Sequence, residues 1–212
     1  MITAKDIYVS FSHLSSLSVL IPIILCLTKY SAFNNQLKAL FFYLLVNLIN
    51  DIICFILFSN KFSTTLFFEI FTIFEGLIIL YIYAKQFNLS TKVILIYEAA
   101  LLGLLVIIYI VPGIPSDFGS ASVAILLCSL GVIYFNKVFN ELQIPILTNY
   151  YFFWLNTAFL FYFGTTFLLS LFENFIRSSA ETVSIFLWSI QLACNIIQNF
   201  LLSIGIWKIQ KK

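Results

Sequence analysis

Long apolar runs with almost no charged side chains dominate the sequence. A helix that crosses a bilayer needs about 20 mainly apolar residues. Stretches of this kind cover residues 8–28, 37–58, 64–84, 93–111, 118–136, 150–171 and 182–206. Only 9% of the residues are charged, whereas a soluble domain carries about 25%. We therefore predict an all-α polytopic bundle of seven transmembrane helices, with residues 1–212 forming a single transmembrane domain in the lipid bilayer.

Other classes of protein fit these runs poorly. Strands of a transmembrane β-barrel alternate apolar and polar residues over about ten positions, but these runs are continuously apolar. The net charge of +2 is small, and no basic patch with interleaved aromatic residues is present, which argues against nucleic acid as a partner.

The distribution of basic residues between the loops predicts the orientation. With seven spans, one side of the membrane receives Lys29, Lys38, Lys85, Lys92, Lys137, Lys208, Lys211 and Lys212. The other side receives only Lys5, Lys61 and Arg177. Cytoplasmic loops carry the excess of Lys and Arg. We therefore expect a multi-pass protein of the cell (inner or plasma) membrane, with its N-terminus outside and its C-terminus in the cytoplasm.

Four carboxylates lie inside the predicted spans, namely Asp51, Glu69, Glu75 and Glu98. A charge at the centre of a bilayer costs at least about 2.5 to 3.5 kcal/mol, so such groups usually face the bundle interior and are functional. In the predicted orientation Asp51 lies in the outer half, Glu69 near the outer rim and Glu75 near the middle. Glu98 lies near the cytoplasmic start of its helix, where its side chain reaches the interface.

Two of the predicted helices carry a polar stripe at helical spacing, which places its members on one face. On the second helix the stripe consists of Asn47, Asn50, Asp51 and Cys54. On the seventh helix it consists of Gln191, Asn195, Gln198 and Asn199. Together with His13, the outer members of these stripes and the carboxylates predict one polar cavity open to the outside, the kind of concave site that binds ligands. The alternative is that the amides are interhelical glue, at about 0.6 kcal/mol per hydrogen bond, and that His13 is interfacial.

Several kinds of chemistry are excluded or disfavoured. The chain has a single histidine, whereas zinc hydrolases and most membrane haem sites need several. Every lysine lies at a helix end or in a loop, which excludes a retinal Schiff base, and the sequence contains no GxSxG, HExxH or P-loop motif. We expect no catalytic residue, no metal and no cofactor. Only a carboxylate chemistry of Asp51 with Glu75 stays open.

The last two predicted spans, FFWLNTAFLFYFGTTFLLSLF at 152–172 and LWSIQLACNIIQNFLLSIGIWK at 187–208, carry a resemblance. This part of the chain resembles an uncharacterised family of small bacterial seven-helix integral membrane proteins. The residues that carry the resemblance are Trp154, Asn156, Tyr162, Trp188, Asn195, Asn199, Trp207 and Lys208. The resemblance implies the seven-helix architecture and a link to signalling through neighbouring sensor kinases. It implies no catalytic residue.

The sequence supports three hypotheses about function. The first is a sensor or receptor-like protein that binds a small or lipidic ligand in the outer cavity and signals through a membrane or cytoplasmic partner. The second is a small proton-coupled transporter with Asp51 and Glu75 as protonatable groups. The third is a structural subunit of a membrane complex, in which the polar stripes only hold helices together.

Overall fold

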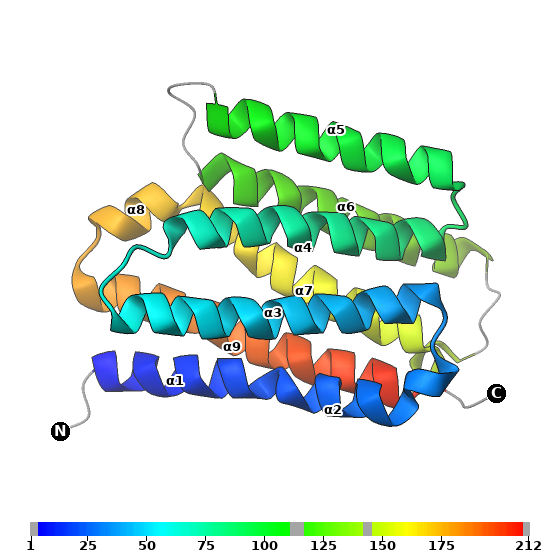
Figure 1. Cartoon of the computed structure of the whole chain (residues 1–212), viewed down its shortest axis with the longest axis horizontal. Coiled ribbons are helices and arrows are strands. Elements are labelled where there is room, and N and C mark those ends of the chain that lie inside the picture. The colour runs from blue at the N-terminus through cyan, green and yellow to red at the C-terminus, as the bar shows by residue number, and fades with distance from the viewer. Residues whose placement is uncertain (1–3, 111–116, 142–145, 210–212) are drawn as a thin grey trace.

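The computed structural model describes residues 4–110, 117–141 and 146–209, and within these ranges the chain is helical and contains no strand (Figure 1). The longer helices are α1 (Ala4–Ser18), α2 (Leu20–Lys29), α3 (Asn35–Ser59), α4 (Thr65–Gln86), α5 (Thr91–Ile110), α6 (Asp117–Glu141), α7 (Tyr151–Leu171) and α9 (Glu181–Trp207). Shorter elements are the 3₁₀ turns η1 (Tyr30–Ala32) and η2 (Leu147–Asn149) and the helix α8 (Glu173–Ser178). The all-α prediction is confirmed.

The first predicted span, 8–28, consists of two helices, α1 and α2, that meet at Val19. Pro22 explains the interruption, because proline has no N–H to donate to the carbonyl of Ser18 and its ring crowds that carbonyl. The α8 segment differs from the sequence-based expectation of a loop. The predicted span 118–136 is also extended, because α6 continues to Glu141, where Lys137 forms an i,i+4 ion pair at 3.9 Å with that residue.

The loops that follow α3 and α4 are sharp turns, and each contains a residue in the left-handed conformation. Lys61 (φ 60°) follows α3, and Asn88 (φ 57°) follows α4. At the end of α4, the N–H of Leu89 donates to the carbonyl of Ala84 at 2.9 Å, and the N–H of Asn88 donates to the carbonyl of Lys85 at 3.1 Å. This is the pattern of a Schellman cap, which satisfies the last carbonyls of a helix and reverses the chain.

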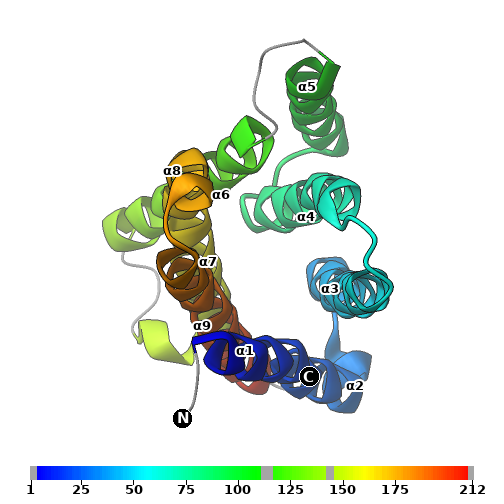
Figure 2. The same ribbon diagram turned by 90° about the vertical axis from the view of Figure 1, so that its left-hand side faces the viewer.

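The helices form a ring when the bundle is viewed along its axis (Figure 2). Around the ring the order is α1 with α2, then α9, α7, α6, α4 and α3, which returns to α2. Helix α5 lies outside the ring, where it packs against α4 and less closely against α6. Successive long helices alternate in direction, so the two termini lie at opposite ends (Figure 1). We call these ends the N-side, which carries the start of α1, and the C-side, which carries the end of α9.

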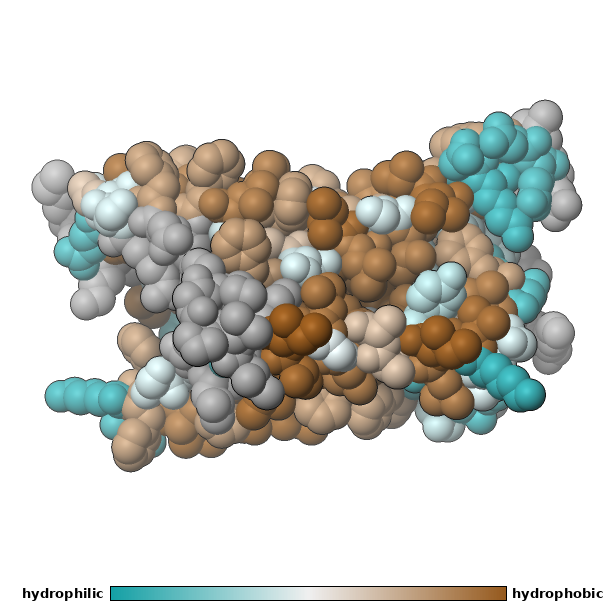
Figure 3. Space-filling view, turned by 90° about the horizontal axis from the view of Figure 1, so that it is seen from above, coloured by the Kyte–Doolittle hydropathy of each residue, from teal (hydrophilic) through white to brown (hydrophobic). Residues whose placement is uncertain are grey.

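Six helical segments within the described residues are long and apolar enough to cross a membrane: 6–32, 35–59, 67–86, 118–141, 151–171 and 181–207. Helix α5 occupies the fourth predicted span, 93–111, up to Ile110, and residue 111 lies outside the described ranges. Apolar side chains cover the middle of the face seen in Figure 3, and hydrophilic residues gather toward its two ends. This pattern is typical of a multi-pass membrane protein.

The two halves of the ring are packed differently. On α3 and α7 the buried positions extend from the C-side only as far as Leu44 and Phe163. On α4 and α9 the described residues include no buried position on the N-side of Glu75 and Cys194. The C-side half therefore holds the dense core, while the side chains of these four helices in the N-side half are only partly covered.

Candidate functional site

A buried carboxylate lies where the dense core ends. Glu75 of α4 is 6% exposed, and its Oε1 accepts a hydrogen bond at 3.0 Å from the hydroxyl of Tyr43 on α3. The Tyr43 hydroxyl in turn accepts a hydrogen bond at 3.3 Å from Nε2 of Gln198 on α9. Three helices of the ring thus meet at the hydroxyl of Tyr43. We call these three residues the Glu75 cluster.

The local sequence explains how this cluster forms. Gly76, next to Glu75, lies against α6 and α5, where an added Cβ would come 3.0 Å from Cγ1 of Val123 and 3.3 Å from Cδ2 of Leu101. The small residue lets α4 lie close to α6 and turns Glu75 toward the interior. The ring of Tyr43 packs edge-on against Phe159 with 6.0 Å between the centroids. This contact holds the hydroxyl of Tyr43 toward Glu75, and the cluster is therefore positioned by packing on both sides.

The charge of Glu75 has no cationic partner among the described residues. Its described partner is the Tyr43 hydroxyl, and Tyr43 and Gln198 are themselves 1% and 2% exposed. A purely structural carboxylate inside a membrane is usually paired or fully hydrogen-bonded. The second oxygen of this carboxylate therefore has capacity for a further donor.

A second group of polar side chains lies next to the cluster, toward the N-side. The Tyr162 phenol of α7 is near enough to both Glu75 and Asp51 for their charges to act on it. Nε2 of Gln191 donates to Oγ1 of Thr166 at 2.7 Å, while Gln191 Oε1 is buried and has no hydrogen-bond partner within the described part of the chain. Tyr162 therefore links the sequence-predicted Glu75, Asp51 and Gln191, which follow one another toward the N-side because Asp51 lies two turns beyond Tyr43 on α3.

The remaining residues of the α3 stripe are less closely integrated. Asn47 interacts with the Tyr43 side chain, and Asp51 interacts with Ser16 of α1. The Sγ of Cys54 lies 3.8 Å from Oδ1 of Asn50, one turn away on the same helix. Asn47 and Asp51 therefore reach the other polar groups of the interior, whereas the described bond of Asn50 stays within α3.

The polar stripe of α9 divides between two partners. Nδ2 of Asn195 donates to Oγ of Ser15 at 2.9 Å, and Nδ2 of Asn199 donates to Oγ of Ser18 at 2.8 Å. These two bonds join α9 to α1, and their geometry favours the interhelical-glue interpretation for both asparagines. Of this stripe, Gln198 belongs to the Glu75 cluster, and Gln191, seven residues earlier, belongs to the polar group next to it.

Two predicted site residues lie apart from the cluster. His13 is exposed, and its ring lies edge-on to Phe55 with 6.4 Å between the centroids. Glu69 is half-buried in the second turn of α4, and no hydrogen bond to the cluster is found for it among the described residues. The position of His13 fits the interfacial alternative.

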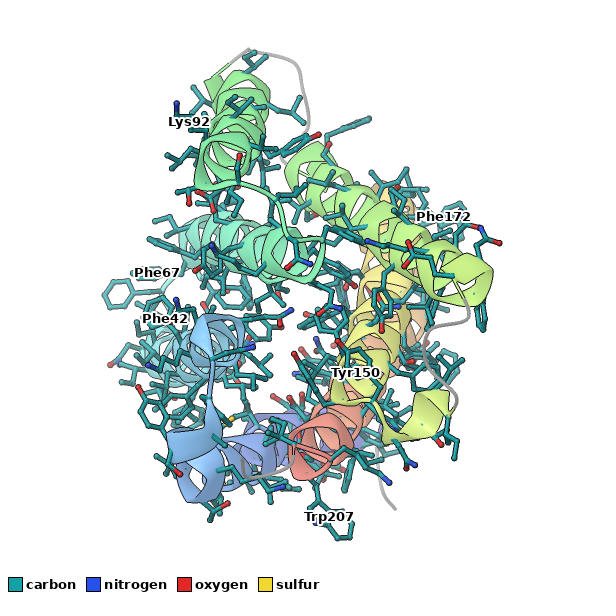
Figure 4. The ribbon with its side chains drawn as sticks, turned by 90° about the vertical axis from the view of Figure 1, so that its right-hand side faces the viewer. Phe42, Phe67, Lys92, Tyr150, Phe172 and Trp207 are labelled. Atoms are coloured by element: carbon teal, nitrogen blue, oxygen red, sulfur yellow. The ribbon has the colours of Figure 1, made fainter. Side chains whose placement is uncertain are left out.

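Sequence reasoning missed a polar network at the C-side. The side-chain amide of Gln36 on α3 donates from Nε2 to the carbonyl of Ile82 at 3.0 Å and to Oε1 of Gln86 at 3.2 Å. Its Oε1 accepts from the hydroxyl of Tyr151 at 3.1 Å, and Gln86 Nε2 donates to the Tyr150 hydroxyl at 3.1 Å. Gln36, Gln86, Tyr150 and Tyr151 thus connect α3, α4 and the start of α7, and we call them the C-side latch. In Figure 4 Tyr150 lies near the inner edge of the ring, whereas Trp207 points away from it.

The latch was missed because its residues lie at helix ends, where polar side chains usually meet water. In the sequence Gln36 stands among the polar residues of a loop. Only the start of the helix at Asn34 distinguishes it from the loop residues. Oδ1 of Asn34 caps α3 by accepting the N–H of Leu37 at 2.9 Å. An N-cap at Asn34 places Gln36 in the first turn, and that was the available signal.

Two cavities in the C-side half are lined by described residues. One, of about 210 Å³, is lined by Ala39, Phe42, Leu77, Ile78, Tyr81 and Glu98 between α3, α4 and α5. The other, of about 660 Å³, lies at the C-side surface near Asn34, Tyr150 and Lys208. The cavity expected in the outer half stays a prediction. The described residues include no group of three or more His, Cys, Asp or Glu side chains that would hold a metal ion.

Comparison with known proteins adds no relative. No family model matches the chain, and neither the curated proteins nor the solved structures contain a significant match. The resemblance in the last two helices stays a prediction, and the functional argument depends on the geometry of the Glu75 cluster.

Proposed function

We propose that this chain is a seven-span sensor of the cell membrane that binds a small or lipidic ligand at the Glu75 cluster and signals through a partner. The observation that carries the proposal is Glu75 itself. Its buried carboxylate accepts a hydrogen bond from a hydroxyl group and pairs with no cationic side chain among the described residues. It lies at the boundary between the densely and the loosely packed halves of the bundle. Such a group costs free energy to place in a membrane and is a functional site by default.

The proposed topology uses α5 as the seventh span. This helix has 20 residues and a strongly apolar composition, and it packs on α4 beside the other spans. The side-chain charges support the orientation with the C-side in the cytoplasm, because that end of the bundle carries most of the described lysines, namely Lys29, Lys38, Lys85, Lys92, Lys137 and Lys208.

The chemistry of the cluster favours a ligand that donates hydrogen bonds or carries a positive charge. Glu75, Asp51 and the unpartnered Oε1 of Gln191 are all acceptors. An amine or hydroxyl group placed at Glu75 would bond to the second oxygen of that carboxylate, and Asp51 and Gln191 offer acceptors to further donor groups of the same ligand. The apolar side chains around the cluster would hold the remainder of an amphipathic molecule.

The same helices connect the cluster with the cytoplasmic end. Helix α3 carries Tyr43 of the cluster and Gln36 of the C-side latch, while α4 carries Glu75 and Gln86. A ligand that separates α3 from α4 at the cluster changes the distance between Gln36 and Gln86 at the latch. A signal reaches the basic cytoplasmic loops in this way, where a membrane or cytoplasmic partner would read it.

The difference in packing also supports a second candidate, a small proton-coupled carrier. Carriers expose a central site to one side at a time. Here the C-side is closed by a dense core and the latch, while the N-side half is loosely packed above Glu75. In this alternative Glu75, with Asp51, would bind and release the coupled proton.

Replacing Glu75 by glutamine tests the proposal. We expect a screen of the purified protein against amines, amphiphiles and lipids to find a stabilising ligand, since a ligand at a hundred times its dissociation constant adds about 2.7 kcal/mol of stability. Glu75→Gln should lose that stabilisation, because the carboxylate that meets the donor is gone. The measurement is the thermal unfolding of both proteins in the same detergent.

Glu69→Gln is the matched control, because it makes the same change on the same helix outside the cluster. Equal stabilisation of wild type and Glu75→Gln by every ligand would contradict a site at Glu75. Retained binding with loss of pH-dependent uptake into vesicles would favour the carrier. The absence of any ligand would favour a structural subunit.

A further inference from the structure

The 660 Å³ cavity lies at the C-side surface, away from the Glu75 cluster, and its lining is amphipathic. It is formed where the start of α3 meets the segments before α7 and after α9. Phe33, Leu37 and Ile209, each less than 9% exposed, supply apolar walls. Asn34 and Lys208 supply polar ones. A cavity of this size at a membrane surface accommodates a polar head with the beginning of an apolar tail.

The electrostatics of the cavity are positive. Lys208 Nζ donates to Oδ1 of Asn149 at 3.4 Å, a long bond between two exposed side chains that leaves the ammonium with further donors. The N-terminal end of the 25-residue helix α3 faces the same space, since Asn34 and Leu37 both line it. Helix N-termini carry partial positive charge and free N–H groups. No carboxylate is found among the residues that line the cavity.

The partial negative charge at the C-terminal end of α9, next to the cavity, is compensated by Lys29. Lys29 Nζ donates to the carbonyl of Trp207, the last residue of α9, and to that of Ile209 just beyond it. The C-terminal carbonyls of α9 therefore do not cancel the positive potential of Lys208 and α3. The lining of the cavity is therefore net positive, on the side of the bundle that carries most of the described lysines.

We propose that this cavity binds the phosphate of an anionic lipid, with Lys208 as the charged donor beside the positive N-terminal end of α3. The depth and apolar walls of the cavity favour a lipid over free phosphate, because Phe33, Leu37 and Ile209 contact the glycerol and first methylenes. Basic pockets between helices on the cytoplasmic side are the places where anionic head groups bind. This site is independent of the ligand site at Glu75.

The test uses the purified full chain in detergent and measures lipid binding by native mass spectrometry. Phosphatidylglycerol should bind, and diacylglycerol, which lacks the phosphate, should not. Lys208→Gln should weaken phosphatidylglycerol binding about tenfold, the loss expected for one charge-assisted hydrogen bond. Lys92→Gln, at the same end but outside the cavity, should bind like the wild type. Ser31→Trp, which fills the cavity from its wall, should lose binding although Lys208 is present.

Three outcomes would overturn the proposal. One is equal binding by Lys208→Gln and the wild type, and another is an equal loss in Lys92→Gln, which would indicate a diffuse surface charge. The third is binding of inorganic phosphate that depends on Lys208 without binding of phosphatidylglycerol, which would show a phosphate site but contradict the lipid as its source.

Discussion

Gly205→Leu is expected to destabilise the bundle by about 3 kcal/mol, at the upper end of the cost of overpacking a core. Gly205 lies where α9 crosses the start of α7, and an added Cβ would come 3.0 Å from the carbonyl oxygen of Tyr151 and 3.2 Å from Cβ of Trp154. These atoms belong to or adjoin the backbone and do not yield by rotating a side chain. The two helices would have to separate, whereas small residues at membrane helix crossings allow the backbones to approach closely.

Gly164→Leu is the control for this substitution. Gly164 is also a helical glycine, on α7, and an added Cβ there meets no atom within 4 Å. Thermal unfolding of the two variants in one detergent compares them directly. A midpoint for Gly205→Leu equal to that of Gly164→Leu would contradict the close α7–α9 crossing.

Asn156→Leu is expected to lower the free energy of unfolding by about 2 kcal/mol, the typical cost of leaving a buried polar group unpaired. Oδ1 of Asn156 accepts from the Tyr83 hydroxyl at 2.6 Å, and its Nδ2 donates to the carbonyl of Gly131 at 3.2 Å. These bonds join α7 to α4 and α6 inside the core, where Asn156 and Tyr83 are 0% exposed. Leucine keeps the branched shape and the number of side-chain heavy atoms of asparagine but is bulkier, so further variants are needed to separate the lost hydrogen bonds from packing.

Two further variants separate this effect from packing. Thr157→Val, the neighbouring position, removes only a bond at 2.8 Å to the carbonyl of Phe153 on the same helix, and it should change stability little. The double variant Tyr83→Phe with Asn156→Leu should recover part of the loss, because it removes the Tyr83 hydroxyl that Asn156→Leu leaves without its partner. A double variant less stable than Asn156→Leu would contradict the proposed role of the Tyr83 hydroxyl.

The helical elements were predictable because a membrane requires long apolar helices. The predicted spans 37–58 and 182–206 correspond to α3 and α9 within two residues at either end. Internal breaks follow subtler chemistry. The interruption at Val19 was implied by Pro22, but α8 within the charged segment after α7 had no periodic signal long enough to indicate a helix.

For the candidate site, the sequence predicts which polar residues share a helix face. It does not predict which residues on other helices they contact. Helical spacing identifies which residues share a face, and Asp51, Glu75 and Gln191 each interact with the Tyr162 side chain. Spacing does not tell which neighbour a face meets, so Asn199 was grouped with Gln198 although its amide bonds to Ser18. Tyr43, the partner of Glu75, was missed because it lies within an apolar run, four residues before the polar stripe of α3 begins at Asn47.

The central claim is that the N-side half of the bundle, beyond the level of Glu75, is open to the outside. Labelling of Cys54 tests it most directly, since this half-buried cysteine lies one turn beyond Asp51 on α3. A variant with Cys54 as its single cysteine should react in intact cells with a membrane-impermeant thiol reagent. A variant with only the buried Cys194 should react after denaturation alone. Reaction of Cys54 only from the cytoplasmic side, or none until the protein is unfolded, would contradict the claim.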